Sequence, residues 1–197
     1  WPVITARYTR GVKGVMGSDF DYDKLRLSIS KRMKLGPLGV GYTSLTGEYV
    51  FDVLPYPLLS LHLGNQTPVY AQVTYNLMNY GEFISDHYVA LQYRQYFEGL
   101  FLNRIPLIQK LNWRLLATTN IISGGMRDNN WAMISELDPS GQETVEAGRF
   151  QNGKPYVEVG YGVENIFKCL RVDFVHRLTY LDNPNVRKFG VLFSIQL

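Results

Sequence analysis

The sequence predicts an all-β fold, an antiparallel transmembrane β-barrel of which about eight strands are visible. Three observations support this prediction. Apolar and polar residues alternate with a period of two over long segments, which is typical of strands with one apolar face. Most of these segments exceed the roughly 5–6 residues of an ordinary strand and reach the about 9–11 residues that cross a bilayer. The connections alternate between long and short, as in membrane barrels.

The composition excludes several other classes of protein. Of the 197 residues, 46% are apolar and 19% are charged, which is too apolar for a disordered chain. The single cysteine, Cys169, excludes an internal disulfide framework and a metal site built from several thiolates. No stretch of about 18 apolar residues occurs, so a transmembrane helix is excluded. The net charge of +3 is too small to indicate a nucleic-acid partner.

In the first half of the chain we expect strands at residues 2–10, 22–33, 38–50 and 82–97. Leu25, Leu27 and Ile29 alternate with hydrophilic neighbours in the second of these segments. In the fourth segment, Leu91 and Tyr93 alternate with polar residues. A Leu-Gly-Pro turn at 35–37 separates the second strand from the third.

In the second half we expect strands at 111–122, 155–162, 168–181 and 186–197. Val157 and Val159 alternate with Glu158 and Gly160 in the second of these. The pattern is clearest in the last segment, where every second residue is apolar up to the C-terminus: Phe189, Val191, Phe193, Ile195 and Leu197. Such a strand is typical of the closing strand of a membrane barrel.

The predicted connections differ strongly in length. Those at 11–21, 51–81 and 123–154 are long, whereas those at 34–37 and 163–167 are short. Outer-membrane barrels have long outer loops and short periplasmic turns, so the alternation matches them. The connection at 98–110 is long for a turn, and the one at 182–185 is short for an outer loop.

Periodicity alone does not separate a membrane barrel from a soluble barrel, because the two place the same faces in opposite directions. We assign the polar face to the lumen, because it carries charges of both signs and small residues that leave room for long side chains. The candidate lumen-lining residues are Lys24, Arg26, Arg32, Asp86, Arg94, Arg114, Glu158, Arg171, Asp173 and Arg177. The candidate lipid-facing residues are Val172, Phe174, Val191, Phe193 and Ile195.

Several segments together resemble a known family. They are residues 55–67 (PYPLLSLHLGNQT), 76–79 (NLMN), 82–86 (EFISD), 99–106 (GLFLNRIP), 154–158 (KPYVE) and 162–167 (GVENIF). They resemble the C-terminal β-barrel region of a Bacteroidetes outer-membrane family of unknown function. Its full-length members carry a signal peptide and a carboxypeptidase-regulatory-like domain at the N-terminus. The resemblance implies that residues 1–197 are a single-domain C-terminal fragment of a larger outer-membrane barrel.

We therefore expect the chain not to close a barrel by itself. With Glu164, the predicted lumen holds seven basic and four acidic groups, and a narrow closed lumen would leave cations unpaired at low dielectric. Pro2 also cannot donate to a strand ladder. The sequence predicts an open sheet edge at 2–10, or a neighbouring chain that covers it. The partners implied are outer-membrane lipid, the barrel-assembly machinery, and upstream strands or a neighbouring subunit.

The leading hypothesis is a non-enzymatic protein of the Gram-negative outer membrane with a role in transport or envelope biogenesis. We expect no cofactor, metal or nucleic acid, because no metal-ligand spacing or phosphate-binding loop is present. One alternative is an outer-membrane lipid-modifying or lipid-hydrolysing enzyme, since Ser85 and His87 lie on one face of a predicted strand. A further alternative is a soluble ligand-binding barrel.

The two longest connections leave a question open. Residues 51–81 are rich in Tyr and Asn and carry no charge after Asp52. Such a segment suits a contact with a glycan or protein partner, and it equally suits a plug that touches only its own protein. The sequence does not decide between a plug and a ligand site for this connection or for 123–154.

Replacement of Phe193 by Arg tests the assignment of the two faces. If Phe193 faces lipid near the bilayer midplane, we expect the variant to lose about 2–4 kcal/mol of folding free energy in lipid. Folding into detergent, followed by urea titration, measures this loss. An unchanged Phe193→Arg protein together with an unfolded Arg171→Leu protein would mean that the inside and outside are reversed.

Overall fold

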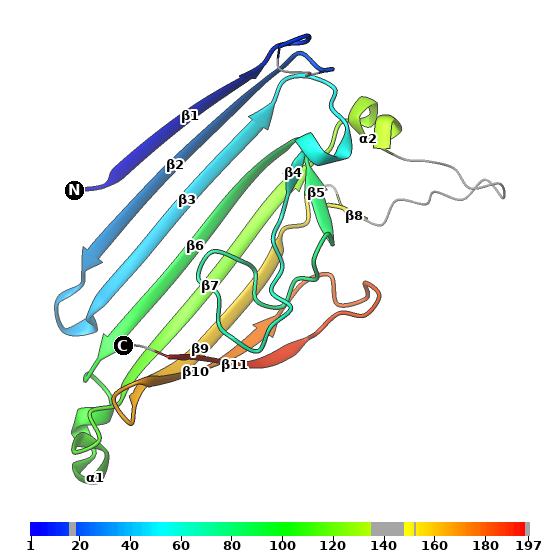
Figure 1. Ribbon diagram of the computed structural model, residues 1–197. Helices are drawn as coiled ribbons and strands as arrows, with labels where there is room; N and C mark the ends of the chain where they lie inside the picture. Colours follow the sequence, from blue (N-terminus) through cyan, green and yellow to red (C-terminus); the bar gives the residue numbers. More distant parts are fainter. Residues whose placement is uncertain (16–18, 135–147, 152, 196–197) are drawn as a thin grey trace.

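The computed structural model describes residues 1–15, 19–134, 148–151 and 153–195, and its main feature is one large antiparallel sheet (Figure 1). The sheet has eight strands in the order β1-β2-β3-β6-β7-β9-β10-β11. The strands are β1 (Val3–Gly11), β2 (Tyr22–Lys34), β3 (Val40–Val50), β6 (His87–Glu98), β7 (Arg114–Gly125), β9 (Tyr156–Ile166), β10 (Leu170–Arg177) and β11 (Phe189–Ile195). Each strand of this sheet pairs with the next strand of the same sheet along the chain. The prediction of an antiparallel sheet of eight strands is therefore confirmed.

Short elements occupy the connections. A small second sheet consists of β4 (Ser60–Leu61), β5 (Phe83–Ser85) and β8 (Gly148–Arg149). The helices are η1 (Gly36–Leu38), η2 (Tyr56–Leu58), η3 (Leu102–Arg104), α1 (Pro106–Gln109) and α2 (Asp128–Ile134). Among the described residues, no helix has the length and apolar character that a membrane span requires.

Several predicted strands have different bounds in the structure, and the differences at three of them have a visible cause. The segment predicted at 82–97 is divided at Asp86, where β5 leaves for the small sheet and β6 begins. The strand predicted at 168–181 ends at Arg177, because Leu178 and the residues after it turn away from β11. The third strand begins at Val40 because Gly39 adopts a positive φ of 84° beside the carbonyl of Tyr96, where a Cβ would clash.

The sheet is open in the part of the chain that the structure describes. β1 pairs with β2, and no described residue pairs with its other edge. β11 pairs with β10, and its far edge forms one bridge, between Phe193 and Val69 of the connection 51–81. The expected open edge at 2–10 is therefore confirmed, and the eight strands do not form a closed barrel by themselves.

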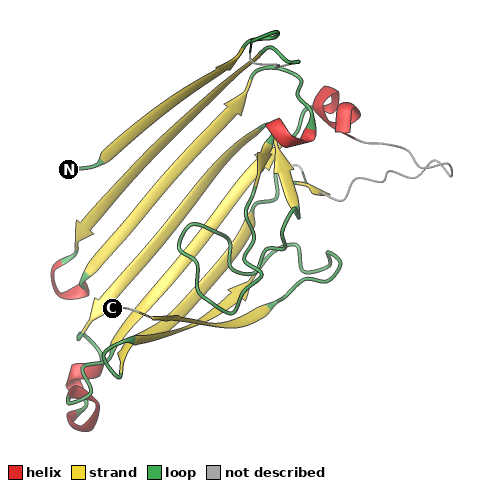
Figure 2. Ribbon diagram, in the orientation of Figure 1, coloured by secondary structure: helices red, strands yellow, loops and turns green. Residues whose placement is uncertain are grey.

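The strand register gives the sheet two different faces. Arg7, Arg26, Glu48 and Tyr88 lie opposite one another on successive strands and define what we call the inner face. Ile4, Ile29, Leu45 and Leu91 lie opposite one another on the outer face. The connection 51–81 lies over the inner face, and β10 and β11 curve around it (Figure 2).

The hydrophobic core lies between this connection and the inner face. Three buried clusters contain residues from 51–81 packed against residues of the strands or of other connections. One cluster joins Tyr70 and Leu77 of the connection to Val175 of β10 and Leu192 of β11. Residues 51–81, called the plug below, thus pack against the sheet of their own chain, and part of the same segment, residues 57–75, lines a cavity. Residues 135–147 and 152 of the connection 123–154 lie outside the described residues, so that connection stays undecided.

Glu158 on β9 is the main polar anchor of this plug. Its side chain is 1% exposed and accepts hydrogen bonds from the backbone N–H groups of Asn76 (2.9 Å) and Leu77 (3.0 Å). It also accepts hydrogen bonds from the Asn120 amide (2.8 Å) and the Tyr156 hydroxyl (3.0 Å). A carboxylate with four donors satisfies both the strand side and the plug side of the interface.

Replacement of Glu158 by Ala should therefore loosen the plug. The backbone N–H groups of Asn76 and Leu77 would remain buried without an acceptor, at a cost of about 1–3 kcal/mol each. Hydrogen exchange of these two amides, followed by mass spectrometry, should become much faster. Glu98→Ala is the control, because Glu98 is exposed at the end of β6. Equal exchange in the two variants would contradict the anchoring role.

Candidate functional site

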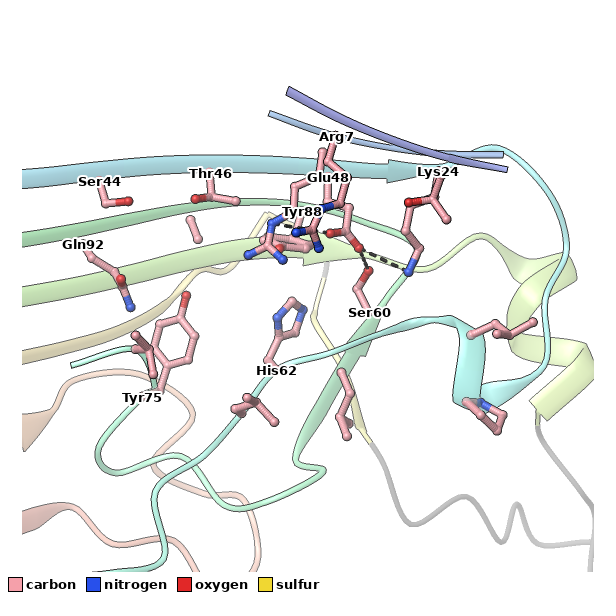
Figure 3. Close-up of a pocket in the computed structure, with 18 of the residues that line it drawn as sticks. Arg7, Lys24, Ser44, Thr46, Glu48, Ser60, His62, Tyr75, Tyr88 and Gln92 are labelled. Atoms are coloured by element: carbon pink, nitrogen blue, oxygen red, sulfur yellow. Dashed lines mark hydrogen bonds and ion pairs between the residues drawn. The ribbon is translucent and has the colours of Figure 1, made fainter. Parts of the chain in front are cut away.

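A polar cavity of about 470 Å³ lies between the N-terminal half of the inner face and the connection 51–81 (Figure 3). Strands β1, β2, β3 and β6 supply one wall, and residues 57–75 of the connection supply the opposite wall. Its position follows from the fold, since the plug covers the inner face of the later strands and leaves that of the first strands partly open.

Glu48 is the central acidic group of this cavity. Its side chain is 7% exposed, and its carboxylate lies 3.5 Å from Lys24 Nζ and 3.7 Å from Arg26 Nε. The hydroxyl of Ser60, on β4, donates a hydrogen bond to the same carboxylate. Glu48 on β3 therefore links β2 to β4 of the small sheet.

Cations outnumber carboxylates in the cavity wall. Arg7, Lys24 and Arg26 line it, and Glu48 is the one carboxylate among its lining residues. Arg7 and Arg26 lie directly opposite each other on β1 and β2. Three positive charges and one negative charge leave a local excess of two positive charges.

His62 closes the cavity on the plug side and is held in its neutral form. Its Nε2 lies 2.7 Å from the hydroxyl oxygen of Ser85, and its ring packs edge-on against Tyr88 and Phe150. Burial, with a smaller contribution from the positive charge of Arg26, lowers the pKa of His62 to about 3. At neutral pH this side chain therefore acts as a hydrogen-bonding and packing group rather than as a charge.

The pairing of Ser85 with His87 that the enzyme hypothesis used is replaced in the structure. Ser85 is fully buried against His62, whereas His87 Nδ1 lies 2.6 Å from Asp86 Oδ1. His87 lies on the outer face and Ser85 does not, because the chain divides between them at Asp86. The hypothesis assumed one continuous strand, and that assumption is wrong.

Asp86, a predicted lumen residue, has a different role at the end of the sheet. Its buried carboxylate accepts hydrogen bonds from Arg127 Nε (2.9 Å) and from the amide of Asn130 on α2 (2.6 Å). The Arg127 guanidinium also donates to the carbonyls of Val50 and Phe51. Asp86 thus ties the beginning of the plug to β6 and α2, and it does not take part in the ion pairs of the inner face.

The other predicted lumen residues lie on the inner face, as expected from their alternation. Arg171 and Asp173 form a buried pair with an Nε–Oδ2 distance of 2.7 Å, and the Arg171 guanidinium lies 4.4 Å from the centre of the Tyr70 ring. Arg177 pairs with Glu82 at 2.5 Å. Three further members, Arg32, Arg94 and Arg114, line a second cavity of about 430 Å³.

The five predicted lipid-facing residues lie on the outer face. Val172 and Phe174 are half-buried, whereas Val191, Phe193 and Ile195 are 37%, 45% and 74% exposed.

Arg7, Ser60 and His62 line the same cavity, and the sequence did not predict that they meet. Arg7 alternates with Ala6 and Tyr8, so period-two patterning could have placed it on the same face as Arg26. Ser60 and His62 lie in a connection without periodicity, and no local signal indicates that they meet β3 and β5. Among the described residues, no group of three His, Cys, Asp or Glu side chains is arranged to hold a metal ion.

Replacement of Asp86 by Asn tests its role and has a defined pH dependence. Burial alone would raise the pKa of Asp86, but the hydrogen bonds from Arg127, Asn130 and His87 outweigh it and hold the pKa below the ordinary value. The folded protein thus gains stability from this charge above the ordinary pKa of about 3.9 and loses it as the pH falls further.

We expect Asp86→Asn to lower the free energy of unfolding by about 2–3 kcal/mol at pH 7. This value lies between the costs of losing an exposed and a buried ion pair. The difference from the unmodified protein should shrink below about pH 4. Urea unfolding at pH 7 and pH 3, followed by tryptophan fluorescence, measures both effects. Asp128→Asn is the control, since Asp128 is exposed. A difference that is independent of pH would contradict the ion-pair explanation.

Comparison with known proteins gives a single finding. The family model described as "Family of unknown function (DUF5686) C-terminal domain" matches residues 1–130. These residues include β1 to β7 and the residues that line the inner-face cavity. No curated protein and no solved structure matches the chain. The match covers well over half of the chain, and the protein therefore belongs to the DUF5686 family through the C-terminal domain of that family.

Proposed function

We propose that this chain is a non-enzymatic outer-membrane protein whose sheet forms part of a barrel wall, with a role in transport or envelope biogenesis in a Gram-negative bacterium. One observation carries the proposal. The sheet exposes its apolar face and uses its charged face for internal contacts, which is the reverse of a soluble barrel.

The outer face supports this proposal through its extent. Large apolar side chains are exposed on six of the eight strands of the large sheet. An exposed apolar surface of this extent is unusual for a soluble protein. These residues are Ile4, Tyr8, Leu25, Leu27, Ile29, Leu45, Tyr49, Val89, Tyr161, Phe189, Val191, Phe193 and Ile195. A lipid bilayer covers such a surface without requiring a shaped protein partner.

The inner face supports it through its buried charges. Arg171, Asp173, Arg177 and Glu158 are each 3% exposed or less, and each has a partner of opposite charge or several hydrogen bonds. Burial of these groups is costly unless they are paired. Arg171 and Asp173 pair with each other, Arg177 pairs with Glu82, and the plug donates hydrogen bonds to Glu158. In the proposed arrangement the plug therefore covers the inner face of the later strands.

The free edge of β1 supports a larger barrel. An unpaired strand edge inside a bilayer leaves backbone N–H and C=O groups without partners, at a cost of several kcal/mol for each group. We therefore propose that further strands, of the same protein or of a neighbouring subunit, pair with β1. The barrel-assembly machinery would insert the closed product into lipid.

A pair of identical substitutions at two heights of the sheet tests this function. Leu45 lies in the middle of β3, whereas Leu25 lies near the beginning of β2, opposite Tyr49 near the last residue of β3. Both are on the outer face, and they are 42% and 43% exposed. In lipid we expect Leu45→Arg to cost about 2–4 kcal/mol and Leu25→Arg about 0–1 kcal/mol.

Urea titration of folding into phospholipid vesicles measures both costs. If water covered the outer face, both substitutions would change the stability by less than about 0.5 kcal/mol, as at ordinary surface sites. Equal and small effects would therefore contradict the membrane proposal and favour a soluble barrel.

A further inference from the structure

We propose that the inner-face cavity of Figure 3 binds a small soluble organic anion through its phosphate or carboxylate group. This inference goes beyond the proposed function, because it depends on the cavity and not on the bilayer. It is carried by the charges, the unused hydrogen-bonding groups and the shape of the cavity.

Arg7 and Arg26 form a pair of like charges for which the cavity wall supplies one carboxylate, Glu48, and that carboxylate is shared with Lys24. Arg7 and Arg26 lie directly opposite each other on neighbouring strands, an arrangement that is destabilising by itself. Glu48 lies on the far side of Arg26 and is shared with Lys24 and Ser60. Among the described residues, Arg7 has no acidic partner. An oxyanion between the two guanidinium groups would remove their repulsion and could accept hydrogen bonds from both.

Polar side chains with unused hydrogen-bonding capacity surround these cations. Ser44 and Gln92 point into the same cavity from β3 and β6 (Figure 3). Neither side chain has a hydrogen-bond partner among the residues that the structure describes. The Tyr88 hydroxyl is a third donor in the cavity wall without such a partner. Hydroxyl and amide groups beside Arg and Lys are the usual ligands of phosphate and carboxylate oxygens.

The size of the cavity and its apolar wall on the plug side suit a small organic molecule. A volume of about 470 Å³ lies within the range of about 300–1,000 Å³ that small-molecule sites occupy. The plug side presents Tyr75, Leu61, Leu63 and Val73, which suit the carbon skeleton of an organic anion. Because the cavity opens on the inner face and not on the apolar outer face, we assign a soluble anion rather than a lipid.

Isothermal titration of the protein in nonionic detergent tests this inference. The probes are glucose 6-phosphate, inorganic phosphate and glucose, at low salt. We expect saturable binding of glucose 6-phosphate, weaker binding of phosphate and no binding of glucose. Raising the salt concentration should weaken the binding of both anions.

Two arginine variants of the same strand separate specific from general electrostatic binding. Arg7→Gln should weaken glucose 6-phosphate binding at least fivefold, because Arg7 lines the cavity. Arg10→Gln should leave it unchanged, because Arg10 lies on the opposite face of β1. Both positions are exposed, so both variants should fold. In the absence of ligand, Arg7→Gln should also raise the midpoint of urea unfolding at low salt, because it relieves the repulsion with Arg26.

Three outcomes would overturn the inference. They are the absence of saturable binding by either anion, equal weakening by the two arginine substitutions, and binding of glucose as strong as that of glucose 6-phosphate. None of these outcomes bears on the lipid-facing role of the outer face, so the membrane proposal and the anion site fail separately.

Discussion

The structure depends on one constraint, which is that the charged groups of the inner face must be paired once water is removed from them. The connection 51–81 meets this constraint. Its backbone donates to Glu158, and Glu82, just after it, pairs with Arg177. The apolar residues of the same connection then supply the core that the sheet alone lacks. Polar pairing and apolar burial thus occur at the same interface.

This constraint explains why the apolar face of the strands is left outside. A single sheet has two faces, and the plug covers only one of them. The plug brings hydrogen-bond donors to Glu158 and the ring of Tyr70 to Arg171, so it is the charged face that it covers. The alternating apolar residues are consequently left on the outer face, in a continuous surface that spans most of the sheet. The cavity with Arg7 and Arg26 lies where this covering ends, so its cations are only partly satisfied by the protein.

The strands and their faces could be predicted because both depend on local alternation. The period of two at Leu25, Leu27 and Ile29 requires no knowledge of the partner strand, and the same holds for the C-terminal strand. The contacts of the plug could not be predicted in this way. Glu158 meets Asn76 across a separation of 82 residues, and no pattern in either segment indicates the pairing. The division at Asp86 was missed for the same reason, since Arg127 and Asn130 are far away in the sequence.

The candidate site shows the same division between local and long-range information. Alternation alone predicts that Lys24 and Arg26 share one face of their strand, and the register shows them there. The excess of positive charge in the cavity emerges only when β1 and β2 are placed in register, which brings Arg7 opposite Arg26. His62 lies in a segment without periodicity, and its contact with Ser85 depends on the small sheet that the plug forms with β5.

Spin labelling of the protein in liposomes tests directly whether the outer face of the sheet meets lipid and the inner face meets water. With Cys169 replaced by Ser, single cysteines at Leu45, Thr46 and Val89 would carry a nitroxide label. We expect labels at 45 and 89 to collide with oxygen far more often than with a water-soluble nickel chelate, and the label at 46 to show the reverse preference. Labels at 45 and 89 that collide freely with the nickel chelate would contradict this orientation, because the outer face would then lie in water.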